Sequence, residues 1–334
     1  MKTTSFSAPG KAVLCGEYAV LRGAPAVSVA VNCRARVTVS QVAEKISVVC
    51  TLGFAEGSYR FQVIGECVEW VDRPPGGVSA LLKAVFDDAG VETWQPMALT
   101  IDTRPFFTAT SGKKLGLGSS AAATVALSAA LQKRRPEIAN IWTTAAVSHK
   151  KLQGGRGSGI DIATSCFGGL ITYKSDDEAP PKQNTWPAGL FYQFFYSGMA
   201  ADTIEAIDRV DGIGEGSWTV LVREATNTAM AWQSRDVKKI LRAMEKYTDS
   251  LREFDLLYGL SIFGGRHQEL VDLARTASLV YKPCGAGGGD IGVALSTTKE
   301  ELQMFAEHAH INGFMPLDLE TDNNGVMPVT GENA

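Results

Sequence analysis

The stretch Lys114-Leu-Gly-Leu-Gly-Ser-Ser-Ala-Ala122, continued by Ala-Thr-Val-Ala-Leu-Ser-Ala-Ala-Leu131, decides the fold of this chain. Two glycines and two serines lead into a run of helix formers, so we expect a glycine loop followed by a helix. A helix start presents unpaired N–H groups and the positive end of a dipole, which suits phosphate. Small side chains at Ser119 to Ala122 would let phosphates approach the backbone closely. The stretch therefore predicts a nucleotide phosphate loop.

The same residues also satisfy the dinucleotide-binding pattern G-x-G-x-x-A, beginning at Gly116. That pattern requires a buried parallel strand directly before the first glycine. The preceding residues, Thr108-Ala-Thr-Ser-Gly-Lys-Lys114, are polar and charged and do not resemble a central strand. The P-loop pattern G-x-x-x-x-G-K-[ST] is missing from the sequence as well. A glycine-rich helix start is often only a tight turn, so the loop alone does not establish nucleotide binding.

Two further segments carry a family resemblance. They are Ser7-Ala-Pro-Gly-Lys-Ala-Val-Leu-Cys-Gly-Glu-Tyr-Ala-Val-Leu21 and Lys282-Pro-Cys-Gly-Ala-Gly-Gly-Gly-Asp-Ile-Gly-Val-Ala-Leu295. With the glycine loop between them, they resemble the three ordered motifs of the GHMP kinases, a superfamily named for galactokinase, homoserine kinase, mevalonate kinase and phosphomevalonate kinase. The resemblance implies an α+β fold in two domains. Residues 1–185 would resemble ribosomal protein S5 domain 2 and carry the ATP phosphate loop, and residues 186–334 would be ferredoxin-like, with the nucleotide in the cleft between them.

The composition is that of a globular protein. The 334 residues are 45% hydrophobic and 20% charged, enough for a large core in one or two domains. A net charge of -4 without a basic stripe makes nucleic acid a poor partner. No apolar run is long enough to cross a membrane and no secretory signal is evident, so we expect a cytoplasmic protein, either a monomer or a homodimer. The six cysteines are scattered without C-x-x-C pairs, which predicts buried, reduced thiols.

Hydrophobic periodicity predicts the elements. The expected strands are 27–31, 36–40, 58–72, 97–102, 167–173, 191–196 and 291–295. The expected helices are 79–89, the segment after the glycine loop, 137–153, 225–232, 236–253, 270–276 and 299–310. Residues 174–189, rich in Asp, Glu, Pro and Lys, are the expected linker.

Lys11 and Asp161 are the expected catalytic residues. Lys11 could be a charge at a strand edge that reaches solvent, but the resemblance implies that it points into the active site and neutralises developing negative charge. Asp161 ends the segment Gln153-Gly-Gly-Arg-Gly-Ser-Gly-Ile-Asp161, which resembles the superfamily's substrate loop. Asp161 could simply cap a helix. The resemblance implies that it acts as a base or as an electrostatic partner of Lys11.

The resemblance also implies two sets of binding residues and a metal. ATP would contact Lys114, Gly116, Leu117, Gly118, Ser119, Ser120 and Ala121. The acceptor would contact Glu17, Tyr18, Arg156, Ser158, Gly159, Gly285, Ala286 and Gly287. Mg²⁺ would be held by phosphates, water and Ser119 or Ser120. Lys150 stands where mevalonate kinases carry a magnesium-binding glutamate.

The spelling of the motifs most resembles that of phosphomevalonate kinases. Tyr18, in the segment Gly-Glu-Tyr18, stands where mevalonate kinases and galactokinases usually have histidine. Lys114 also matches the phosphomevalonate kinase form of the glycine loop. The resemblance implies ATP-dependent phosphoryl transfer to a small phosphorylated acid, first of all mevalonate 5-phosphate. Arg156 could contact the existing phosphate of this acceptor, or it could be a solvated loop charge. Mevalonate, a sugar, or a non-catalytic sensor with this fold remain the alternatives.

Overall fold

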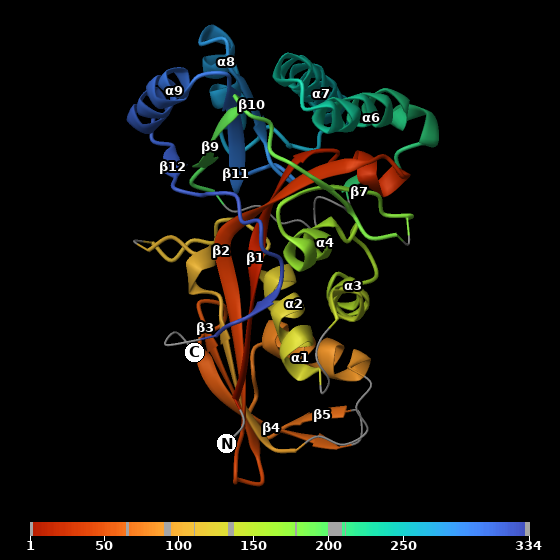
Figure 1. Ribbon diagram of the computed structural model, residues 1–334, viewed down its shortest axis with the longest axis vertical. Coiled ribbons are helices and arrows are strands. Elements are labelled where there is room, and N and C mark those ends of the chain that lie inside the picture. The colour runs from red at the N-terminus through yellow and green to blue at the C-terminus, as the bar shows by residue number, and fades with distance from the viewer. Residues whose placement is uncertain are drawn as a thin grey trace.

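The computed structural model describes residues 3–64, 67–89, 95–109, 111–132, 137–177, 179–199, 209–210 and 212–330. Within these ranges the strands form two sheets, each covered by helices, which confirms the α+β class. In Figure 1 the first sheet fills the lower part of the molecule and the second sheet the upper part.

The first sheet is built on two long antiparallel strands, β1 (Thr3–Cys15) and β2 (Ala26–Gln41). In β1 the chain is buried from Ser5 to Cys15. Among the described residues this sheet has nine strands, in the order β13-β1-β2-β6-β3-β4-β5, with β7 pairing to β2 and β8 to β7. The remaining strands are β3 (Ser47–Leu52), β4 (Gly57–Ile64), β5 (Cys67–Trp70), β6 (Met97–Asp102), β7 (Leu170–Tyr173), β8 (Lys182–Asn184) and β13 (Met327–Pro328).

Helices α1 (Gly76–Asp88), α2 (Ser119–Leu131), α3 (Ile138–Leu152) and α4 (Ile160–Phe167) lie together on one side of this sheet (Figure 1). Helix α2 is the innermost helix: every residue except Ser120 is buried, and it contacts both β1 and β2. Its small side chains allow this close packing against the strands. The phosphate-loop sequence therefore starts a core helix, and the start of this helix is fixed in space by the sheet.

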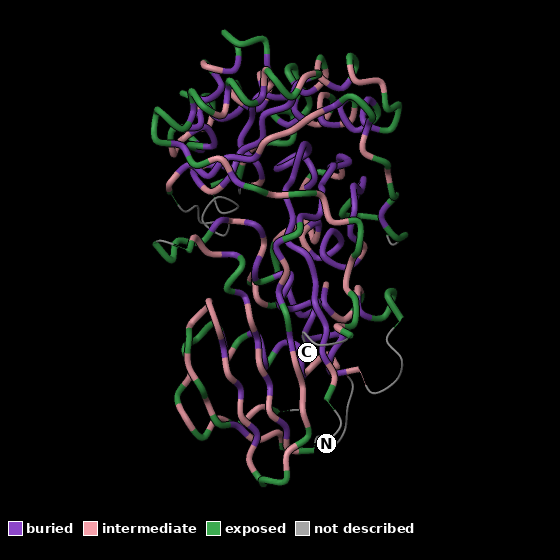
Figure 2. Tube along the Cα trace, turned by 60° about the vertical axis from the view of Figure 1, so that its left-hand side comes forward, coloured by how far each residue is buried: buried purple, intermediate pink, exposed green. Residues whose placement is uncertain are grey.

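The second sheet is antiparallel, in the order β10-β11-β9-β12. Its strands are β9 (Phe191–Tyr196), β10 (Val280–Pro283), β11 (Ile291–Ser296) and β12 (Met315–Leu317). The accompanying helices are α6 (Thr219–Ser234), α7 (Val237–Tyr258), α8 (His267–Thr276) and α9 (Lys299–Ile311). Short 3₁₀ turns lie at η1 (Ala19–Arg22), η2 (Arg104–Phe106) and η3 (Glu215–Trp218). Figure 2 shows buried chain running from the first sheet into the second part of the molecule.

After β12 the chain returns to the first sheet. Strand β13 pairs with β1, and Arg34 holds this returning segment through Asp322 at 2.5 Å and the carbonyl of Gly325 at 2.6 Å. Both ends of the chain accordingly lie at the lower part of the molecule in Figure 1. The division into domains at residues 185 and 186 stays a prediction.

Several expected boundaries were wrong. The strands expected at 27–31 and 36–40 are one strand, β2. The strand expected at 167–173 begins only at Leu170, because α4 continues to Phe167 and Gly168 ends it with a φ of 68°. The expected linker contains β8.

The strand expected at 58–72 was wrong as a single strand, because β4 and β5 pair antiparallel, with Phe61 opposite Trp70. Residues 65–66, between these two strands, lie outside the described residues. Cys67 is exposed and Cys50 half-buried, so burial of all six cysteines was wrong. No helix of the described residues is long and apolar enough to span a membrane.

Candidate active site

The three sequence motifs meet around Lys11. The Lys11 N–H donates to the Leu117 carbonyl at 2.8 Å, so β1 is joined directly to the phosphate loop. A Cβ on Gly118 would lie 3.1 Å from the Lys11 side chain, and one on Gly285 would lie 3.6 Å from Lys11 Nζ. The Lys11 side chain therefore lies beside a glycine from the second motif and a glycine from the third. This position confirms that Lys11 points into the molecule and not along a strand edge.

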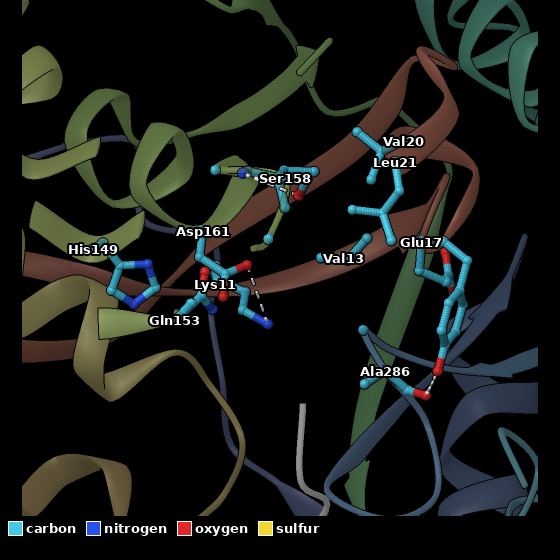
Figure 3. Close-up of a pocket in the computed structure, with 15 residues that line it drawn as sticks. Lys11, Val13, Glu17, Val20, Leu21, His149, Gln153, Ser158, Asp161 and Ala286 are labelled. Carbon is cyan, nitrogen blue, oxygen red and sulfur yellow. Dashed lines mark hydrogen bonds and ion pairs between the residues drawn. The ribbon is translucent and has the colours of Figure 1, made fainter. Parts of the chain in front are cut away.

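Lys11 forms an ion pair with Asp161. The Nζ–Oδ1 distance is 3.6 Å, and the side chains are 11% and 25% exposed. Figure 3 shows the two side chains next to each other, with His149 and Gln153 close by. The N-cap of α4 is Gly159, in the left-handed conformation at φ 81°, and Asp161 lies in the first turn of the helix. The reading of Asp161 as a plain helix cap was wrong, because a glycine takes that position.

The phosphate loop lines an open cavity of about 1330 Å³. Gly118 is the N-cap of α2 at φ 79°, and no described side chain caps this helix start. The first N–H groups of α2 therefore have no partner within the helix and suit an anion in the cavity. Among the predicted ATP contacts, the residues that line it are Lys114, Gly116, Gly118, Ser119 and Ser120. Leu117 and Ala121 are buried beneath the loop.

Asp290 of the third motif also lines this cavity. A Cβ on Gly116 would come within 2.2 Å of an Asp290 carboxyl oxygen, so only glycine fits there. Phe54, Leu81 and Leu152 add apolar walls. The cavity thus combines a phosphate-binding floor with apolar walls, which is typical of a nucleotide site.

A second cavity, of about 680 Å³, adjoins the first at Lys11 and Asp161. Its predicted acceptor residues are Glu17, Tyr18, Ser158, Gly159, Gly285 and Ala286, and Val13, Val20 and Leu21 provide apolar wall (Figure 3). Tyr18 Oη donates to the Ala286 carbonyl at 2.5 Å. Gly287 does not share this wall: a Cβ there would lie 2.4 Å from the Ile262 carbonyl, so it packs against the protein.

Beneath the second cavity lies a buried ion pair that the sequence did not reveal. Lys282 is fully buried and contacts the carboxylate of Glu17, and Tyr247 Oη donates to the Glu17 carbonyl oxygen at 2.9 Å. Burial raises the pKa of Glu17, and the Lys282 ammonium opposes that rise. Motifs one and three are therefore joined by a charge pair as well as by the Tyr18 contact.

A third, basic cavity of about 750 Å³ shares Ser158 and Gly159 with the second. Lys150 and Arg156 line it, and no carboxylate is found among the described residues of its wall. Arg156 thus borders a cavity next to the one that Lys11 and Asp161 line. Lys151, another nearby cation of the sequence, is paired with Asp88 at 2.5 Å instead.

His149 is a site residue that the motifs did not identify. It lines all three of these cavities, is 3% exposed, and its Nε2 lies 3.2 Å from Ser120 Oγ. Burial lowers the pKa of His149; Asp161 opposes this, whereas Lys11 and Lys114 reinforce it. By sequence position, Lys150 stands where mevalonate kinases carry the glutamate. In the structure, His149, one position earlier, is the residue that faces Ser120. Its spacing of four from Ala145 and eight from Ile141 on the buried face of α3 could have revealed it.

Sequence comparison agrees with this geometry. Residues 78–169 match the family model described as the GHMP kinases N terminal domain. A phosphomevalonate kinase of Streptomyces sp. (strain CL190) is 28% identical, over 97% of this chain and 99% of that protein. A mevalonate kinase of Methanothermobacter thermautotrophicus is 29% identical, over 86% of this chain and 88% of that protein.

Solved structures share the fold. A Lin0012 protein of Listeria innocua superposes with a TM-score of 0.84 at 22% identity, over 99% of this chain and all of that one (100%). The phosphomevalonate kinase of Streptococcus pneumoniae, in complex with phosphomevalonate and AMPPNP, superposes with a TM-score of 0.78 at 19% identity, over 96% of this chain and 100% of that one. Residues 78–169 therefore form a GHMP kinases N terminal domain, and the chain as a whole is similar to GHMP kinases in sequence and in fold.

Proposed function

We propose that this kinase transfers the γ-phosphoryl group of ATP to the phosphate of mevalonate 5-phosphate, giving mevalonate 5-diphosphate and ADP. An acceptor phosphate oxygen forms a bond to the γ-phosphorus, and the bond from that phosphorus to the β–γ bridging oxygen breaks. The phosphomevalonate kinase of Streptomyces, which aligns over nearly the whole chain, supports this acceptor.

The catalytic pair suits a phosphate nucleophile. The second pKa of a phosphate monoester is about 6, so the acceptor is mostly a dianion at neutral pH and attacks without first losing a proton. Lys11 then has the main role, because it lies between the two cavities and offsets the charge of the reacting phosphates. Asp161 would hold the Lys11 ammonium in place through the ion pair.

The donor set fits a magnesium ion that arrives with the nucleotide. The described residues contain no group of three or more His, Cys, Asp or Glu that could hold a metal by themselves. Ser119 and Ser120 offer hydroxyl oxygens on the wall of the phosphate cavity, and Asp161 offers a carboxylate there. Hard oxygen ligands of this kind, completed by phosphate oxygens, suit Mg²⁺. When bound, the ion would offset phosphate charge, and Ser119 or Ser120 would hold it.

The observation that carries the choice of acceptor is the basic cavity. Lys150 and Arg156 line this cavity and bring positive charge next to the second cavity, where the acceptor would bind. An acceptor with a phosphate and a carboxylate needs such charge, because it must lie close to the negative γ-phosphate. Mevalonate, which lacks the phosphate, needs less.

The test compares kcat/KM for mevalonate 5-phosphate, mevalonate and galactose with ATP, measured by ADP release. We expect a strong preference for mevalonate 5-phosphate. Arg156→Ala should raise the KM for this acceptor about tenfold, since one charge-assisted contact is lost. Arg73→Ala, an exposed arginine outside the cavity walls, is the control and should leave KM unchanged.

The competing acceptor is mevalonate, which the 29% identical mevalonate kinase of Methanothermobacter favours. A wild-type preference for mevalonate, or activity on galactose alone, would contradict the proposed acceptor.

A further inference from the structure

His149 lies where three cavities meet: the first cavity, lined by the phosphate loop (the nucleotide cavity), the second cavity (the acceptor cavity) and the third, basic cavity. It sits in the last turn of α3 and is almost completely buried, whereas Ser120, its hydrogen-bond partner, is exposed toward the nucleotide cavity. A buried imidazole that contacts an exposed hydroxyl of the phosphate loop can control how that hydroxyl is oriented.

The orientation depends on which partner supplies the proton. A serine hydroxyl has one proton and two lone pairs. If Ser120 donates to Nε2, both of its lone pairs stay available to a cation. If Nε2 carries the proton instead, one lone pair is used in the hydrogen bond. The 3.2 Å contact between Nε2 and Ser120 Oγ is the geometry that acceptance by the ring requires, and it leaves the exposed side of the hydroxyl toward the nucleotide cavity.

We propose that His149 is a positioning residue: its Nε2 accepts a hydrogen bond from the Ser120 hydroxyl and so directs the Ser120 oxygen lone pairs to the metal that accompanies the nucleotide. This inference rests on the proposed function, because it requires a metal–nucleotide complex in the phosphate cavity. It also gives the site a distinctive property. The described residues hold no group of three or more His, Cys, Asp or Glu, so the protein would hold the metal only together with nucleotide phosphates.

The consequence can be measured without turnover. ADP affinity is determined by titration calorimetry with Mg²⁺ and with the metal removed by a chelator, and the ratio of the two affinities is the metal enhancement. A residue with a merely structural role would weaken both affinities equally. His149 should affect only the enhancement, because it acts on the serine that contacts the metal.

Four variants test the proposal. His149→Ala and Ser120→Ala should each reduce the metal enhancement about tenfold, the scale of one hydrogen-bonded ligand. His149→Gln places an amide acceptor near the position of Nε2 and should stay within about threefold of wild type. In the double variant, His149→Ala with Ser120→Ala, the loss should be no greater than in Ser120→Ala alone.

The outcomes separate this inference from the proposed function. Mn²⁺ alone, followed by electron paramagnetic resonance, should show no tight binding without ADP and clear binding with it. An unchanged metal enhancement in His149→Ala, losses that add in the double variant, or tight binding of Mn²⁺ alone would overturn this inference and leave the proposed function standing. A wild type that binds no nucleotide would overturn both.

Discussion

At the scale of single residues, Lys11 is held in place by contacts of its backbone, its side-chain stem and its ammonium group. Its backbone is hydrogen-bonded to Leu117, its stem lies against Gly118, and its ammonium pairs with Asp161. All these contacts fix one charge between two cavities. Preorganised charge of this kind is usually the largest contribution to phosphoryl transfer.

We therefore expect Lys11→Met and Asp161→Asn each to lower kcat by about a hundredfold or more, with ADP affinity changed much less. The measurement is kcat from ADP release, together with ADP binding by calorimetry. Lys113→Met is the matched control, because Lys113 contacts the Gly198 carbonyl at 3.0 Å and lies outside the described cavity walls. A variant at Lys11 or Asp161 that turned over at the wild-type rate would remove that residue from the catalytic pair.

Gly118 provides a second prediction. Gly118 and Gly112 both have positive φ values, 79° and 61°, so alanine is strained at each. Only at Gly118 does a Cβ meet another group, the Lys11 side chain at 3.1 Å, whereas nothing lies within 4 Å at Gly112. Gly118→Ala should therefore lower kcat about tenfold by displacing Lys11, and Gly112→Ala should not. Equal kcat values in the two variants, with similar thermal stability, would show that Lys11 tolerates the shift.

The sequence motifs predicted Lys11, Asp161 and the two serines, because each stands in a short local pattern. They do not include His149: its spacing on α3 indicates a buried position, but its contact with Ser120 depends on α3 packing beside α2. Lys282 stands in the third motif and Glu17 in the first, 265 residues apart, so no local pattern could show that they form a pair. Local patterns identify the residues of a loop, and tertiary packing decides which other side chains meet them.

At the scale of elements, glycines decide where helices begin and end near the site. Gly159 begins α4 and Gly168 ends it, both with positive φ. The expected strand at 167–173 was wrong at its start because the apolar residue Phe167 fits a helix end as well as a strand. Periodicity alone does not distinguish these readings over a few residues.

Helix α8 is joined to the third motif through His267. The buried ring contacts Tyr281 Oη of β10 at 2.8 Å and the Gly289 carbonyl of the glycine-rich loop at 2.7 Å. Burial lowers the pKa of His267 from 6.5 to about 4. The unfolded chain therefore takes up a proton below about pH 6.5 that the folded protein does not, and stability falls as the pH decreases from that value toward 4.

Linkage gives the size of this effect. Between about pH 7.5 and about pH 5.5, His267 should reduce the free energy of unfolding by about 1.4 kcal/mol. His267→Gln cannot titrate, so its free energy of unfolding should lack this part of the pH dependence, whatever its absolute stability. Urea unfolding of both proteins at the two pH values measures the difference. Identical pH dependence in wild type and variant would show that the pKa of His267 is the same in the folded and the unfolded protein.

At the scale of the whole molecule, the site exists only because the two sheets come together. The nucleotide loop belongs to α2, beside the first sheet, and the glycine-rich third motif links β10 and β11 of the second. The α+β class and the order of the motifs could be predicted from the sequence. The return of the chain to β1 through β13 could not, because a two-residue strand leaves no periodic signal.

The buried pair of Glu17 and Lys282 joins these two parts, and it gives the last prediction. Lys282→Met leaves the Glu17 carboxylate buried without its partner, and breaking a buried ion pair in this way typically costs about 3–5 kcal/mol. Combining it with Glu17→Gln removes both charges and keeps a carbonyl acceptor for Tyr247 Oη, so the double variant should recover most of the lost free energy of unfolding.

Lys239→Met, which breaks the exposed pair with Asp236 at 3.5 Å, is the control and should change stability by less than about 1 kcal/mol. Because Glu17 also lines the acceptor cavity, the recovered double variant should still show a raised KM for the acceptor. A double variant as unstable as Lys282→Met would mean that Lys282 stabilises the protein through its contacts with the Pro283 carbonyl and the Tyr247 ring, and not through its charge pair with Glu17.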